Sequence, residues 1–155
     1  MLFRSGYPRH AAGTISAALI KGGAPGAERM LWDDAEGKKA ITDYRVVSTA
    51  GEKITWLELS PRTGRTHQLR AHCALIETPI IGDAKYPGVL NPDPDQRIDL
   101  RDGLLADIAG QLCLHARRLV IERPGKAPLV LEAPLPPHMA EAFAQLGFEL
   151  SEARA

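Results

Sequence analysis

The segment from residue 54 to residue 77 constrains the fold most, because it predicts a strand, a tight turn and a helix in direct succession. Residues 54–59 are dense in Ile, Trp and Leu, as expected of a buried strand, and Pro61 and Gly64 mark the turn. From about residue 66 to residue 77 the apolar residues have helical spacing, which would place three of them on one face: Leu69, Cys73 and Ile76.

The turn would bring basic side chains to the start of that helix. Either Thr63 or Thr66 is expected to be the N-cap. Arg65, His67 and Arg70 would then surround a helix start whose unpaired backbone N–H groups favour a carboxylate or a phosphate. The alternative is an ordinary solvated surface, since basic residues near loops are usually exposed.

Two hairpins are predicted. Residues 39–49 alternate between faces and are joined by Gly51 to the strand at 54–59. Residues 118–122 and 129–132 are also strand-like and flank Pro124-Gly125. A further strand is expected to end at Leu2-Phe3, whereas residues 14–20 and 104–114 are too mixed to assign, and residues 22–26 and 91–103 are interpreted as loops.

A closing helix is predicted over residues 138–146, with a packing stripe of Met139, Phe143 and Leu146 and a stop at Gly147. Strands in hairpins with two packed helices predict an α+β fold, not alternating βαβ units. The 155 residues are the size of one domain, and no apolar run approaches the roughly 20 residues of a membrane span.

Charge and cysteines narrow the function classes. Nineteen basic and nineteen acidic residues give zero net charge, which argues weakly against a free-standing nucleic-acid-binding domain, although residues 115–126 are locally basic. Cys73 and Cys113 form no C-x-x-C pair and are expected to be ordinary thiols. No signal peptide precedes the chain's first turn, so a cytoplasmic location is expected. The histidine spacing predicts no metal site.

The string T-G-R-T-H-Q-L-R-A-H, followed by P-I-I-G-D-A-K-Y, resembles the third motif of the RluA-type RNA pseudouridine synthases. The matching positions are Thr63, Gly64, Arg65, Thr66, His67, Gln68, Leu69, Arg70, His72, Pro79, Ile80, Gly82, Asp83 and Tyr86. Further similarity is found in G-K-K-A-I-T-D-Y from Gly37, in L-H-A from Leu114 and in A-P-L-P near residue 134, so the resemblance covers roughly residues 6–140.

The resemblance implies a catalytic domain built on a mostly antiparallel mixed sheet with flanking helices, acting on ribosomal or transfer RNA without a cofactor. By the same resemblance Arg70 pairs with the catalytic aspartate and Leu69 packs near the base. Positioning of RNA and contacts with its backbone are assigned to Arg65, Thr66, His67 and Gln68, and His72 and His115 are expected to be structural.

The family's aspartate lies in an H-R-L-D-x-x-T-S-G motif, and no such string occurs in these 155 residues. The tyrosine-bearing K-x-Y-x-A-x-V-x-G string is also absent from them. We therefore expect residues 1–150 to be the C-terminal portion of an incomplete catalytic domain, with residues 151–155 as a tail, and we expect it to be inactive alone. Asp83 is expected to serve a turn and not to replace the nucleophile.

Incompleteness has two expected consequences. Arg70 would lack the catalytic carboxylate and would pair with solvent, an anion or a substitute acid, so its replacement by Ala should change stability by no more than about 0.5 kcal/mol. An uncovered sheet edge or apolar face would favour self-association. The competing hypothesis is a non-catalytic RNA-binding or interaction module that retains half of the fold.

Overall fold

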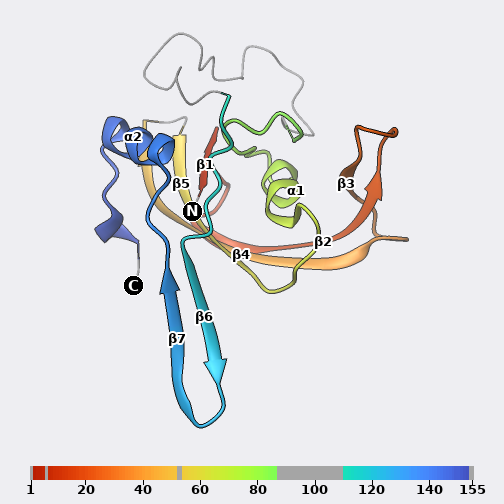
Figure 1. Cartoon of the computed structure of the whole chain (residues 1–155). Helices are drawn as coiled ribbons and strands as arrows, with labels where there is room; N and C mark the ends of the chain where they lie inside the picture. The colour runs from red at the N-terminus through yellow and green to blue at the C-terminus, as the bar shows by residue number, and fades with distance from the viewer. Residues whose placement is uncertain (1, 6, 52–53, 87–109, 154–155) are drawn as a thin grey trace.

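The computed structural model describes residues 2–5, 7–51, 54–86 and 110–153, and its main feature is a five-stranded antiparallel sheet (Figure 1). The strand order is β1-β5-β4-β2-β3. The strands are β1 (Leu2–Ser5), β2 (Ala12–Gly22), β3 (Arg29–Trp32), β4 (Lys38–Ala50) and β5 (Ile54–Pro61). The strand expected at Leu2-Phe3 and the first predicted hairpin, β4–β5, are both confirmed.

The sequence did not reveal strands β2 and β3, of which β2 is the longer. Its side chains alternate in burial, and Ile15, Ala17 and Leu19 point into the protein. Ile15 lies opposite Thr42 and Ala17 lies opposite Ala40 in the register with β4. Alanine and glycine have low strand propensity, so an alternating pattern built on small residues was not recognised.

Helix α1 (Gln68–Leu75) packs over β2 and β4 and is shorter than the predicted 66–77 (Figure 1). The predicted stripe is only partly correct, because Cys73 is fully buried whereas Leu69 and Ile76 are half-buried. The helix instead buries Gln68, Ala71, His72, Cys73 and Ala74. A small patch of alanines allows α1 to approach Leu19 and Ala40 of the sheet closely, in a cluster that also contains Tyr86.

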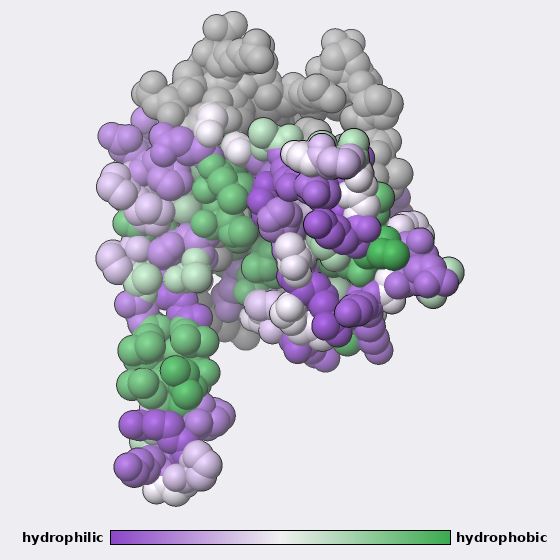
Figure 2. All heavy atoms as spheres, turned by 45° about the vertical axis from the view of Figure 1, so that its right-hand side comes forward, coloured by the Kyte–Doolittle hydropathy of each residue, from purple (hydrophilic) through white to green (hydrophobic). Residues whose placement is uncertain are grey.

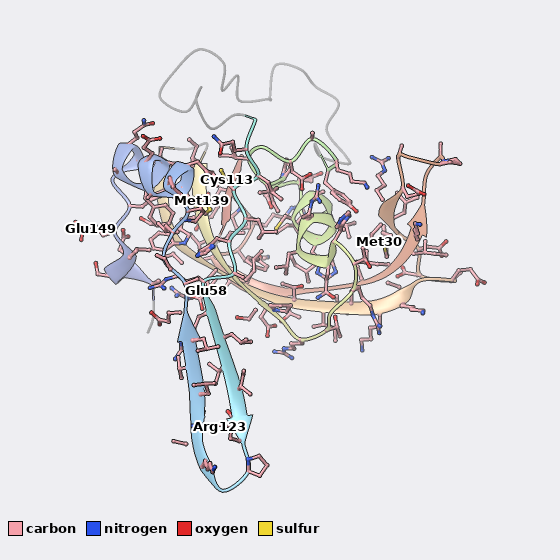
Figure 3. The ribbon with its side chains drawn as sticks, viewed as in Figure 1. Met30, Glu58, Cys113, Arg123, Met139 and Glu149 are labelled. Atoms are coloured by element: carbon pink, nitrogen blue, oxygen red, sulfur yellow. The ribbon has the colours of Figure 1, made fainter. Side chains whose placement is uncertain are left out.

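Helix α2 (Pro137–Leu146) confirms the predicted closing helix. Met139 and Phe143 are buried, and the Phe143 ring meets Trp56 of β5 edge-on with centroids 4.6 Å apart. Gly147 ends the helix in the left-handed conformation, with φ of 69°, as glycine does at this position. Met139, Phe143 and Trp56 belong to the larger hydrophobic core, which also contains Cys113. Cys113 lies near Met139 (Figure 3).

The second predicted hairpin is confirmed as β6 (Arg118–Arg123) and β7 (Lys126–Glu132), but it stands away from the main sheet (Figure 1). Every residue of both strands is exposed. Figure 2 shows an apolar band across this protruding hairpin. The structure therefore confirms an α+β fold. The apolar side chains of the β6–β7 hairpin are exposed and do not pack into the described core.

The expected domain boundary stays a prediction. Leu150–Glu152 form a short 3-10 helix, and Ala153 packs against the larger core, so the ordered chain continues into the expected tail. The segments 91–103 and 104–109 lie outside the described residues. No helix in the described part of the chain has the length and apolarity needed to cross a membrane.

His72 makes the fold sensitive to acid. Its side chain is fully buried, its Nδ1 lies 2.9 Å from Thr42 Oγ1, and burial lowers its pKa from 6.5 to about 4. As the pH falls, the unfolded chain therefore binds a proton at His72 at a higher pH than the folded chain does. We predict that the free energy of unfolding, measured by urea titration, decreases by roughly 3 kcal/mol between pH 6.5 and pH 4.

The variant His72→Gln removes this titration and should flatten that part of the stability profile, although it lowers stability at pH 7. His67→Gln is the matched control, because the pKa of His67 is also lowered but its side chain is only partly buried. An unchanged slope in His72→Gln would contradict the assignment.

Candidate functional site

The turn before α1 is fixed to β4 by the side chains of Thr63 and Gln68. Thr63 Oγ1 accepts a hydrogen bond from Ile41 N (2.9 Å) and donates one to Gln68 Oε1 (2.7 Å). Gln68 Nε2 donates to Ile41 O (2.9 Å) and to Thr42 Oγ1 (3.0 Å), and Gln68 Oε1 also accepts from Arg65 N (3.0 Å). These bonds fix the shape of the turn.

The predicted contact of Gln68 with RNA is therefore corrected. The side chain is only 4% exposed, and both its amide nitrogen and its oxygen are engaged inside the protein. Because a buried amide with satisfied partners has no free group to offer a ligand, Gln68 is a positioning residue.

The predicted N-caps are also wrong. The N-cap is His67, which adopts the left-handed conformation with φ of 50° and makes no side-chain cap. The Thr63 hydroxyl is already used between β4 and Gln68, and Thr66 is exposed. A left-handed non-glycine residue is disfavoured by about 1–3 kcal/mol and is found mainly where function or the surrounding structure requires it.

Of the three expected partners, solvent, an anion or a substitute acid, the structure gives Arg70 a carboxylate of this chain. Its Nε and Nη2 donate to Asp83 Oδ2 (2.8 Å) and Oδ1 (2.7 Å), a bidentate ion pair in which the Asp83 side chain is completely buried. Asp83 Oδ1 also accepts from the backbone N–H groups of Lys85 and Tyr86. Both oxygens of Asp83 are thus engaged, which agrees with its expected role in the turn.

The pKa values of the pair follow from these contacts. Burial alone would raise the pKa of Asp83, but the hydrogen bonds from Arg70 and from Tyr86 N outweigh it, and the pKa is lowered. The hydrogen bond to Asp83 raises the pKa of Arg70. Arg70 and Asp83 are therefore both ionised at neutral pH. The third guanidinium nitrogen, Arg70 Nη1, has no hydrogen-bond partner among the described residues.

Tyr86 connects the Arg70–Asp83 pair to β3 and to His67. Its ring lies 5.1 Å from the Arg70 guanidinium carbon, and its hydroxyl accepts a hydrogen bond from Met30 N of β3 (2.7 Å). The same hydroxyl lies 3.1 Å from His67 Nδ1. Figure 3 shows Met30 on the β3 side of α1. Through its contacts with Arg70 and Met30, Tyr86 links α1 to β3.

An open groove of about 510 Å³ lies between the β2–β3 hairpin and the turn before α1. Of the predicted site residues, Arg65, Thr66 and His67 line it, whereas Gln68, Leu69 and Arg70 do not. Leu69 is half-buried, and its predicted place near the base stays a prediction. Among the described residues, no cluster of three or more His, Cys, Asp or Glu side chains could hold a metal ion.

Sequence reasoning missed four basic residues of this groove: Lys21, Arg29, Lys38 and Lys85. They come from four separate elements, namely β2, β3, β4 and the segment after α1, and no local motif joins them. Lys38 lies in the string that begins at Gly37 and Lys85 in the string that begins at Pro79, whereas Lys21 and Arg29 lie in neither.

Comparison with known proteins gives one family. The family described as RNA pseudouridylate synthase matches residues 8–75. An uncharacterised RNA pseudouridine synthase of Zymomonas mobilis is 34% identical over 92% of this chain and 57% of its own length. The dual-specificity RNA pseudouridine synthase RluA of Haemophilus ducreyi is 39% identical over 61% of this chain and 36% of its own length.

A solved structure has the same fold. Human RNA pseudouridylate synthase domain containing 4 superimposes with a TM-score of 0.68 and 25% identity, covering 96% of this chain and 61% of that one. The chain thus spans less than two thirds of each of these relatives.

The Arg70–Asp83 pair revises the expected effect of Arg70→Ala. Removing the guanidinium leaves a buried carboxylate without its counter-ion, so we predict a loss of about 3 kcal/mol in urea unfolding. Arg70→Lys should recover only part of this, because an ammonium cannot form the bidentate pair. The double variant Arg70→Ala with Asp83→Ala should lose less than the sum of the single variants, and strict additivity would contradict the pairing.

Proposed function

Because this chain belongs to the RluA-type RNA pseudouridine synthase family, we propose that it forms one side of an active site that isomerises uridine to pseudouridine in ribosomal or transfer RNA. In that reaction the bond from C1′ to N1 breaks, a bond from C1′ to C5 forms, and N1 gains a proton while C5 loses one. The uracil must leave its stack and meet a carboxylate beside the sugar.

The observation that carries the proposal is the fixed orientation of Arg70. Nε and Nη2 hold Asp83, and Tyr86 covers the guanidinium from one side. Nη1 remains for a second carboxylate, the aspartate that the family carries in its H-R-L-D motif. A guanidinium held in this way would keep that aspartate ionised and oriented at little entropic cost.

We infer that no described residue replaces this aspartate. Asp83 is the aspartate closest in sequence to α1, and both its oxygens are occupied. Asp43 binds Thr14 and Arg62 at the other end of the turn. We therefore propose that the chain supplies positioning groups and that the nucleophile must come from another segment.

We predict that these 155 residues alone convert no uridine in bulk ribosomal or transfer RNA. Adding a polypeptide that carries the H-R-L-D-x-x-T-S-G segment, in cis or in trans, should restore conversion, because residues that act as a unit lose most of their effect when one is missing. Pseudouridine would be scored by carbodiimide labelling and primer extension.

The control is the same added polypeptide with its aspartate replaced by Asn, which should restore nothing. Conversion by the isolated chain would contradict the proposal, and Asp83→Asn would then be the first variant to test. RNA binding without conversion under every condition would favour the non-catalytic module. We also place the protein in the cytoplasm, which fractionation of cells expressing a tagged copy would test.

We further propose that the chain self-associates through the β6–β7 hairpin. Leu119 lies opposite Leu131 and Ile121 lies opposite Leu129, so that four aliphatic side chains share one face. Their exposed fractions range from 38% to 56%. A two-stranded ribbon is marginally stable alone, and this face is self-complementary, so a second copy related by a two-fold axis can cover it.

Charging that face should abolish association. The double variant Leu119→Lys with Ile121→Lys is predicted to sediment as a monomer at concentrations where the original chain sediments as a dimer or larger species. Val120→Lys, on the opposite face of the same strand, is the matched control and should leave association intact. A monomeric original chain at high concentration would overturn the proposal.

A further inference from the structure

We propose that the groove between the β2–β3 hairpin and the turn before α1 binds the phosphodiester backbone of the RNA substrate, an inference that rests on the proposed function. The groove is lined by five basic side chains, Lys21, Arg29, Lys38, Arg65 and Lys85, against two acidic ones, Glu28 and Glu36.

This local excess contrasts with a chain of zero net charge. Lys21 pairs with Glu28 at 3.7 Å, and Lys85 also acts on Glu28, whose pKa is lowered mainly by a backbone hydrogen bond and by Lys21. Arg29, Lys38 and Lys85 form no ion pair with another described residue. A row of cations that the protein does not neutralise itself is the arrangement that a polyanionic strand requires.

His67 adds a directed donor to the same groove. The Tyr86 hydroxyl accepts from Met30 N, so its own proton is available to His67 Nδ1. Neutral His67 then carries its proton on Nε2, the ring nitrogen that Tyr86 does not bind. Burial, followed by the charges of Arg70 and Lys85, lowers the pKa of His67, which keeps the ring neutral at pH 7.

The lining favours the backbone over the bases as the bound part of the RNA. Its apolar members are Leu19, Ile20 and Met30, and none of the described residues that line it is Phe, Tyr or Trp. Proteins that hold single-stranded bases use aromatic platforms, whereas phosphates need only cations and N–H donors. Arg65 and His67 lie just before α1, the helix that contains Arg70. An RNA strand bound in this groove would therefore lead toward Arg70.

The test measures binding of a fluorescein-labelled dodecauridylate by anisotropy at several salt concentrations. The double variant Lys38→Gln with Lys85→Gln should weaken binding at low salt by at least tenfold. It should also reduce the slope of log affinity against log salt by about 1.4, since each phosphate contact on a single strand contributes roughly 0.7. The control is Lys39→Gln with Lys126→Gln, which removes the same charge.

Lys39 neighbours Lys38 on β4 but points to the other face of the sheet, and Lys126 lies on the protruding hairpin, so the control should keep both affinity and slope. Equal losses of affinity in the two double variants, or no loss in either, would overturn the proposal that the groove binds the RNA backbone, while leaving the proposed function intact. If the original chain binds neither this probe nor bulk transfer and ribosomal RNA, the proposed function fails as well. Urea unfolding of each variant shows that a lost affinity is not a lost fold.

Discussion

The buried side chain of Gln68 joins β4, the turn and α1, and the geometry of the site depends on it. Its amide satisfies a backbone carbonyl and a hydroxyl on β4, while its oxygen receives the hydroxyl of Thr63 and the N–H of Arg65. A buried donor or acceptor that loses its partner costs about 1–3 kcal/mol. Several such groups meet at one amide, so the turn has little freedom to relax, and His67 is held in a left-handed conformation.

The Arg70–Asp83 pair organises the opposite end of the same motif. The two residues are 13 positions apart, and their contact closes the chain around α1 and orders the turn that contains Tyr86. Tyr86 in turn fixes Met30 of β3 and the tautomer of His67. One hydrogen-bonded system thus connects the Arg70–Asp83 pair to the basic groove, and both are held by the same rigid elements.

The uneven distribution of charge reconciles a neutral chain with the anionic substrate that we propose. A net charge summed over the sequence reports on solubility and long-range attraction, and it carries no information on which side chains converge. Here the cations of the groove come from β2, β3, β4, the turn and the segment after α1, and the antiparallel order of the sheet brings them together. The β6–β7 hairpin shows the same separation of properties, because its charged residues lie near its ends and four of its aliphatic residues share one face.

The sequence by itself determined the motif turn and its helix, two hairpins, the closing helix and the family, because each depends on residues close together in the chain. Local propensity and turn chemistry act over a few residues and can be seen in the string. The tertiary structure decided that Asp83 is the partner of Arg70, that Gln68 is buried, that His67 is the N-cap, and that five lysines and arginines meet in a groove. It also identified β2, whose small residues form a strand because β4 and α1 pack against them. These features depend on contacts between distant segments, and only the folded chain brings those segments together.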